Sequence, residues 1–206
     1  MMVLIGQYDS PFVRRVGIAL TLYGRTFEHR PWSVFGDGAR VQALNPLMRV
    51  PTLVLEDGFV LTDSHMMLDY LDAVAAEPMF PRDEPARHVA LKRATLATGL
   101  AEKAVSLFYE ARLHERVSDL WVARCRGQIG AVLAALEADR TACPGPWFGA
   151  RLGHEDVALA CALRFATEAL PGVVDLDRHP ALLAHCVRAE ALAVFRTVYQ
   201  PFVAPA

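Results

Sequence analysis

The sequence of 206 residues has no long apolar run and no excess of charge of one sign. None of its apolar stretches approaches the roughly 20 residues that a helix needs to cross a bilayer. With a formal net charge of -2, the chain shows no sign of the basic surface that binds nucleic acid or anionic lipid. We therefore expect neither a nucleic-acid partner nor a membrane partner.

Cysteines are few, and histidines are not spaced as metal ligands. All four cysteines lie in the second half, and no pair has C-x-x-C spacing, which argues against a disulfide framework or a zinc site. We therefore expect free thiols, buried or at the surface, and no bound metal. Two histidines, His65 and His154, stand near expected helix starts and are predicted to lie at the surface. The cysteines are Cys125, Cys143, Cys161 and Cys186.

The opening residues MMVLIGQYDS show neither a basic leader nor the small-residue cleavage site of a secretory signal peptide. Thiols without a disulfide pattern are typical of a reducing compartment, so we expect a cytoplasmic protein. Hydrophobic residues make up 53% and charged residues 21%, which is typical of a chain with a folded core. The sequence contains no internal repeat and no low-complexity segment.

Residues 1–75 alternate between strand-like and helix-like segments. VLIGQY and TFEHRPW have strand length, and VPTLVLEDGFVLTD predicts a hairpin because Asp57-Gly58 favours a tight turn. PFVRRVGIALTLYG repeats apolar residues at helical spacing and is expected to end at Gly24, and SHMMLDYLDAVA is helical again. The predicted order is β-α-β-α-β-β-α, an α+β domain.

The pattern changes after residue 75. Residues 76–86 hold three prolines and several charges, which is typical of a linker. From residue 87 to residue 206 only helical patterns follow, so this part is predicted to be an all-α helical bundle. The expected helices cover residues 87–113, 118–139 and 154–169, with one or two more between 180 and 197.

Ser10 and Pro11 stand at the start of the first expected helix. Serine is a strong N-cap and proline is favoured in the first turn, so capping explains the pair by itself. A functional interpretation is also open. A helix N-terminus presents unpaired N–H groups and a partial positive charge, which can hold an anion such as a thiolate, and a serine hydroxyl can donate one more hydrogen bond to it.

Val50 and Pro51 open a strand in which the missing N–H of proline goes unused. Most X–Pro bonds are trans, and a trans proline at a sheet edge is the simpler interpretation. A cis bond would turn the backbone of Val50 outward, where its N–H and C=O could pair with an extended peptide. The sequence alone leaves both possibilities open.

Thr62, Asp63 and Ser64 stand where a strand gives way to a helix. Capping again explains them. Alternatively, Ser64 and the neighbouring backbone N–H groups bind a ligand carboxylate at the helix end, and Asp63 pairs with a ligand ammonium group.

The joint order of these motifs resembles the cytosolic glutathione transferases over essentially the whole chain. The most specific segments are SPFVRRVGIAL, NPLMRVPTLVLEDG, LTDSHMMLDYL and LGHEDVALACAL. The resemblance implies a thioredoxin-like domain over residues 1–75, a linker over residues 76–86 and an all-helical domain over residues 87–206. It also implies glutathione as co-substrate and a two-fold homodimer.

The resemblance assigns roles to particular residues. Ser10 matches the catalytic serine of the serine-type classes. Val50, before Pro51, matches the residue whose backbone pairs with the cysteinyl part of glutathione. Asp63 and Ser64 match the pair that holds its γ-glutamyl end.

Two further positions bear on the match to the family. Arg49 falls where several classes carry a residue near the glycyl carboxylate. In the bundle, the family usually places Ser or Thr three residues before a buried aspartate, as a capping box. Here Gly153 takes that place before Asp156, and because glycine is an acceptable N-cap we expect the helix to form.

A pocket for a second, electrophilic substrate is expected between the domains. Candidates for its lining are Tyr8, Phe12, Phe108, Tyr109, Arg112 and His114, although Phe108 could equally be a core residue and the charged side chains a solvated face.

The resemblance implies a glutathione transferase, with a glutathione-dependent isomerase or dehalogenase, or a non-catalytic binding protein, as alternatives. Zeta-like isomerases carry SSC where this chain has SPF. A thiol transferase is disfavoured because no cysteine precedes Cys125.

Overall fold

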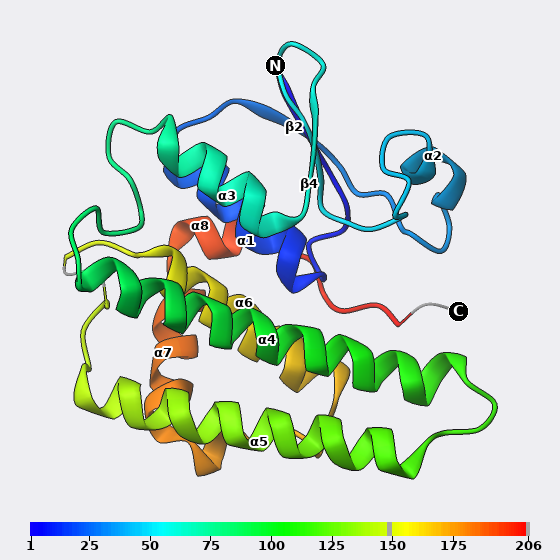
Figure 1. The fold of residues 1–206 in the computed structure, drawn as a ribbon, viewed down its shortest axis with the longest axis vertical. Helices are drawn as coiled ribbons and strands as arrows, with labels where there is room; N and C mark the ends of the chain where they lie inside the picture. Colours follow the sequence, from blue (N-terminus) through cyan, green and yellow to red (C-terminus); the bar gives the residue numbers. More distant parts are fainter. Residues whose placement is uncertain (148–149, 205–206) are drawn as a thin grey trace. The chain divides into compact units, whose positions relative to one another are not determined.

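The computed structural model describes residues 1–147 and 150–204, which form two compact units. The first unit contains Met1–Met79 together with the segment that begins at Leu192, and the second unit is Phe80–Ala191. Figure 1 shows the course of the chain through both units.

A four-stranded sheet forms the centre of the first unit, with the strand order β2-β1-β3-β4. β1 pairs with β2 in parallel and with β3 in antiparallel register, so that Leu4 faces Leu53 and both are fully buried. β3 and β4 form the predicted hairpin, whose turn contains Asp57-Gly58. The strands are β1 (Met2–Ile5), β2 (Phe27–Arg30), β3 (Thr52–Val54) and β4 (Val60–Thr62).

Three helices alternate with these strands along the chain. α1 (Pro11–Leu22) follows β1, α2 (Gly38–Gln42) follows β2, and α3 (Ser64–Ala73) follows β4. In Figure 1, α1 and α3 lie side by side on one side of the strands and α2 lies on the other. The phenol of Tyr23, just after α1, donates to the carboxylate of Asp72 in α3 at 2.7 Å. The expected βαβαββα order of the first domain is therefore confirmed.

The segment after residue 191 differs from the sequence prediction, which assigned all of residues 87–206 to the helical domain. The structure instead places α8 (Ala193–Thr197) in the first unit. The physical reason is the side chain of Arg14 in α1, which is 2% exposed. It donates hydrogen bonds to the backbone oxygens of Phe195 at 2.8 Å and Val198 at 2.9 Å.

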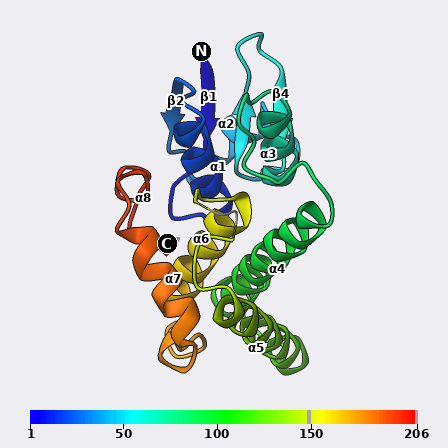
Figure 2. The same ribbon diagram turned by 90° about the vertical axis from the view of Figure 1, so that its left-hand side faces the viewer.

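The second unit is helical, as predicted. α6 is its central helix, and nearly all of its residues are buried, which agrees with a sequence that is apolar on almost every face. α4 and α5 pack on each other, and α6 packs on α4 and α7 (Figure 2). The helices are α4 (Ala86–Leu113), α5 (Asp119–Ala142), α6 (His154–Ala169) and α7 (Pro180–Glu190), with a short 3-10 helix at Leu176–Arg178.

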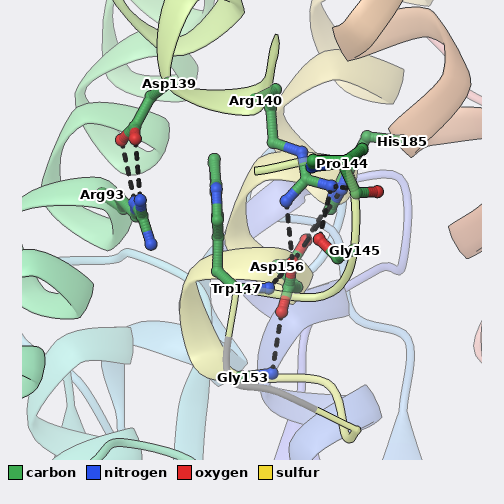
Figure 3. A network of polar contacts seen from close by, with 9 residues as sticks. All are labelled: Arg93, Asp139, Arg140, Pro144, Gly145, Trp147, Gly153, Asp156 and His185. Atoms are coloured by element: carbon green, nitrogen blue, oxygen red, sulfur yellow. Dashed lines mark hydrogen bonds and ion pairs between the residues drawn. The ribbon is translucent and has the colours of Figure 1, made fainter. Parts of the chain in front are cut away.

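A buried polar network surrounds Asp156 in the first turn of α6 (Figure 3). Its carboxylate accepts the backbone N–H of Gly153 at 3.0 Å and that of Trp147 at 3.3 Å. Arg140 from α5 and His185 from α7 lie 3.8 and 3.9 Å from the same carboxylate. Arg140 and Asp156 are each 1% exposed, so these side chains and His185 connect three helices from within the core.

The indole of Trp147 lies between two guanidinium groups (Figure 3). The central carbons of Arg93 and Arg140 are each 4.6 Å from the centroid of its ring, a distance suited to cation–π attraction. Arg93 also forms a two-pronged ion pair with Asp139, at 2.8 and 2.7 Å. These contacts fix Trp147, in the loop after α5, against α4 and α5.

The start of α6 confirms one expectation and corrects another. The helix forms with Gly153 as its N-cap, as expected. His154, predicted to lie at the surface, is 2% exposed, because its ring packs on Phe80 with the centroids 4.6 Å apart. The carboxylate of Glu155, 1% exposed, lies over Gly153 so closely that an added Cβ would come within 2.5 Å of it.

Candidate active site

Ser10 caps the N-terminus of α1. Its backbone is extended, and its Oγ accepts the N–H of Val13 at 3.4 Å, which is a long hydrogen bond. A hydroxyl that accepts a hydrogen bond keeps its own proton for donation elsewhere. The first turn of α1 contains no acidic residue, so the positive end of the helix is not neutralised by a carboxylate from that turn. Capping and anion binding by Ser10 are therefore compatible.

Gly6 brings the loop at Val50 against the first turn of α1. Its φ is +127°, and a Cβ at this position would lie 2.5 Å from Val13 Cγ2 and 2.8 Å from Val50 Cβ, so only glycine fits here. The Val50–Pro51 bond is cis. The amide of Asn45, which is 1% exposed, supports this loop by donating to the backbone oxygen of Arg49 at 2.9 Å.

Asp63 and Ser64 open α3 in an unusual backbone conformation. Asp63 has φ +69° and ψ 123°, and its carboxylate accepts the N–H of His65 at 2.7 Å. A non-glycine residue at positive φ costs of order 1–3 kcal/mol, and such strain is concentrated at functional sites. The structure therefore adds an independent reason to regard Asp63 as a functional residue.

A buried arginine connects the two helix starts. Arg15 in α1 is 3% exposed, and its Nε donates to the hydroxyl of Ser64 at 3.1 Å. Ser10, Val50 and Ser64 are thus grouped around the first half of α1, through Gly6 on one side and Arg15 on the other. The side chain of Arg49, by contrast, is exposed.

Tyr8 is packed inside the first unit. Its ring stacks on His29 with the centroids 3.8 Å apart, and burial raises the pKa of Tyr8 to about 12. His29 has its Nε2 2.8 Å from the backbone oxygen of Gly6, and burial lowers the pKa of His29 despite this hydrogen bond. The ring of Tyr8 therefore holds the loop before Ser10, and its role in a second-substrate pocket stays a prediction.

The other residues predicted to line that pocket belong to different units. Phe12 is half-buried in α1 of the first unit. Phe108, Tyr109 and Arg112 all lie in the last two turns of α4, where the rings of Phe108 and Tyr109 are 5.9 Å apart. A pocket that joins these side chains stays a prediction.

A hollow of about 580 Å³ lies at the end of α4 and the start of α5. It includes Tyr109 and the His114 named from the sequence, but neither Phe108 nor Arg112.

Within the described residues, no group of three or more His, Cys, Asp or Glu side chains could hold a metal ion. No helix in residues 1–147 and 150–204 is long and apolar enough to span a bilayer.

Comparison with known proteins identifies the family. Two family models match: glutathione S-transferase, N-terminal domain, over residues 4–79, and glutathione S-transferase, C-terminal domain, over residues 119–188. The uncharacterised GST-like protein YibF of Escherichia coli is 35% identical over 138 residues, which are 66% of this chain and 68% of that protein. This chain belongs to the glutathione S-transferase family.

Two other proteins are similar to this chain over nearly its whole length. The maleylacetoacetate isomerase of Pseudomonas aeruginosa is 28% identical over 96% of this chain and 95% of its own. A glutathione S-transferase from Methylobacterium radiotolerans, crystallised with glutathione sulfonate, has a TM-score of 0.90 and 27% identity, covering 100% of this chain and 98% of that one.

Several residues that organise the candidate site were not predicted from the sequence. Arg14 and Arg15 are the charged residues of an otherwise largely apolar helix, and such residues require internal partners when the helix is buried. That signal was available in the sequence. The contacts of His29 and of the segment after α8 were not, because they join residues distant along the chain.

Proposed function

We propose that this chain is a glutathione transferase that holds the sulfur of glutathione at the start of α1 and stabilises it as a thiolate. The observation that carries the proposal is the geometry of Ser10, whose Oγ accepts the helix N–H while its proton is left for donation. Further support comes from two similar structures, from Methylobacterium radiotolerans and Pseudomonas fluorescens, which hold glutathione sulfonate and glutathione. They are 27% and 28% identical to this chain.

The free-energy requirement is modest. A free thiol titrates near 8.5, so only a few per cent of glutathione is thiolate at neutral pH. Lowering that pKa by about two units requires a preference for the anion of about 2.7 kcal/mol. One hydroxyl donor and the N–H groups at the positive end of α1 can supply a preference of this size.

The remainder of the tripeptide would be held at three points. The backbone of Val50 would pair with the cysteinyl residue, and Ser64 at the start of α3 would receive the γ-glutamyl carboxylate. Asp63 would pair with the ammonium group of the same residue. The exposed guanidinium of Arg49 would attract the glycyl carboxylate.

The chemical step is a nucleophilic attack on a small electrophile. The thiolate forms a carbon–sulfur bond, and the leaving group departs with the bonding electron pair. The protein contributes position and anion stabilisation, and the reaction needs no general base once the thiolate has formed.

Glutathione-dependent isomerisation is a second candidate, because the maleylacetoacetate isomerase of Pseudomonas aeruginosa is similar over 96% of this chain. In such a reaction glutathione adds to the substrate and is released again, so none is consumed. The residues Ser10-Pro11-Phe12 replace the SSC stretch of zeta-like enzymes, which favours conjugation.

Calorimetric titration with glutathione, followed by assays with an aryl halide, an epoxide, a peroxide and maleylacetoacetate, tests the proposal. We expect saturable binding and turnover of the aryl halide or the epoxide that consumes one glutathione per product, whereas reduction of the peroxide would consume two. Turnover without consumption would instead support the isomerase, and binding without turnover of any of the four would support a non-catalytic binding protein. An absence of heat at millimolar glutathione would contradict the proposal.

A further inference from the structure

The segment after α8 returns to the loop that precedes Ser10. The backbone N–H of Tyr8 donates to the side-chain oxygen of Gln200 at 3.2 Å, and the N–H of Val203 donates to the carboxylate of Asp9 at 3.4 Å. Tyr8 and Asp9 are the two residues directly before Ser10. A segment nearly two hundred residues away along the chain therefore contacts the loop that carries the proposed thiolate donor.

This segment is firmly anchored before it reaches the loop. Arg14 bonds the backbone oxygens of Phe195 and Val198, and its guanidinium lies 5.4 Å from the ring centroid of Phe195. Phe195 is fully buried and Val198 is 3% exposed. Val198 packs so closely on α1 that a Cβ at Gly17 would lie 2.9 Å from its Cγ1. Gln200 comes only two residues after Val198, so its backbone is held close to α1.

The hydrogen bond to Gln200 acts on the turn that sets the position of Ser10. The N–H of Ser10 donates to the backbone oxygen of Gln7 at 3.1 Å, so Tyr8 lies inside this turn. Two other contacts hold the same loop: His29 bonds the oxygen of Gly6 and stacks on the ring of Tyr8. Gln200 holds the amide of Tyr8, a group that neither of these contacts reaches.

We propose that Gln200 is a positioning residue for the thiolate site, acting through the amide of Tyr8 on the turn that carries Ser10. This inference rests on the proposed function, because it gives Gln200 a role in thiolate stabilisation. Catalysis that depends on one hydrogen bond to a charged group is sensitive to displacements of the donor of less than 1 Å. Loss of the Gln200 acceptor would let the turn move and weaken donation from Ser10.

Three variants test the role of Gln200. Gln200→Met keeps the length of the side chain and removes the acceptor, whereas Gln200→Glu keeps an acceptor oxygen. Gln42→Met is the matched control, because Gln42 is an exposed glutamine of α2. Each variant is measured for amide hydrogen exchange at Tyr8, for the pH titration of bound glutathione thiolate, and for kcat and KM.

For Gln200→Met we expect exchange at Tyr8 to be about tenfold faster and kcat to be about fivefold lower, as for the loss of one ordinary hydrogen bond. The thiolate titration should move to higher pH while KM for glutathione changes less than twofold. Gln200→Glu keeps the acceptor and should restore the slow exchange at Tyr8, although its added negative charge disfavours a nearby thiolate. Gln42→Met should match wild type throughout.

Faster exchange at Tyr8 with an unchanged thiolate titration and unchanged kcat would overturn the proposal, because Gln200 would then be only structural. Unchanged amide hydrogen exchange at Tyr8 in Gln200→Met would also overturn the proposal, because it would show that the contact with Gln200 does not restrain the loop. The exchange measurement needs no glutathione. If wild type binds no glutathione, the proposed function and this inference both fail, whereas wild-type turnover with an unaffected Gln200→Met variant removes the inference alone.

Discussion

The helices α1 and α6 begin in opposite ways. α1 has Ser10 as N-cap and no acidic residue in its first turn, whereas α6 has Glu155 and Asp156 there, each 1% exposed. Both helix ends carry the same partial positive charge. At α6 the chain's own carboxylates lie at this positive end, whereas the first turn of α1 contains no carboxylate. This difference agrees with the proposal that the start of α1 binds the glutathione sulfur, whereas the start of α6 stabilises the fold.

The largest expected effect is a loss of stability at the start of α6. Asp156→Ala removes the acceptor of two backbone N–H groups and leaves Arg140 without its buried counter-charge. We expect the free energy of unfolding to fall by about 3–5 kcal/mol, measured by urea denaturation. Asp139→Ala breaks an ion pair whose carboxylate is 35% exposed, and it should cost about 1 kcal/mol or less. Equal losses for the two variants would contradict this view of Asp156.

The next effect is on ligand binding at the start of α3. Asp63→Asn keeps the acceptor for the N–H of His65 but loses the negative charge proposed to pair with the γ-glutamyl ammonium group. Calorimetry should show glutathione binding about tenfold more weakly, as for a lost hydrogen bond to a charged group. Asp57→Asn is a matched control, because Asp57 accepts the N–H of Phe59 two residues on in the same way. The Asp63 assignment fails if both variants bind like wild type.

A smaller effect is expected from restoring the serine that Gly153 replaces. Serine is a better N-cap than glycine, yet Gly153→Ser should destabilise the protein by about 1 kcal/mol, because its Cβ would displace the carboxylate of Glu155. Glu155→Ala makes room, so in a double-mutant cycle the two changes should be coupled favourably by about 1 kcal/mol. Additive free energies of unfolding would show that Glu155 does not occupy the space of a capping side chain.

The smallest expected effect is a pH dependence of stability in the helical unit. Burial lowers the pKa of His185 below its ordinary 6.5, with Asp156 and Arg140 beside it. Its Nε2 lies 2.9 Å from the backbone oxygen of Asp156, where the neutral ring can donate. The unfolded chain takes up a proton near pH 6.5 while the folded chain does not, so stability is complete above that pH and falls as the pH is lowered through it.

Urea denaturation between about pH 7.5 and about pH 5 measures this dependence, because this range brackets the ordinary histidine pKa. Burial also lowers the pKa of His29, so part of the slope is expected to come from the first unit. His185→Gln should therefore reduce the slope without abolishing it. An unchanged slope in that variant would show that His185 is not among the groups responsible.

Features that depend on neighbours along the chain could be predicted from the sequence. The start of α1 depends on neighbours along the chain, so Ser10-Pro11 was sufficient to identify its cap, and the confirmed hairpin at Asp57-Gly58 is local in the same way. The cis state of Val50–Pro51 was left open, since it is set by packing around the loop.

The failures of prediction share one physical cause. The position of His154 near an expected helix start predicts a surface residue, but Phe80, more than seventy residues earlier, covers its ring. The segment from Leu192 onward appeared to continue the bundle because its pattern is helical, but the guanidinium of Arg14 holds it in the first unit. Contacts between residues distant along the chain leave no periodic signal in a single sequence.

The most direct test of the account is the thiolate absorbance of bound glutathione, followed as a function of pH in wild type, Ser10→Ala and Ser118→Ala. Ser118 caps α5 as Ser10 caps α1, accepting the N–H of Trp121 at 3.3 Å, so both variants lose a cap of similar strength. We predict that wild type and Ser118→Ala titrate about two pH units below free glutathione and that Ser10→Ala titrates well above them. If all three proteins titrate at the same pH, Ser10 is only a helix cap and the account is wrong.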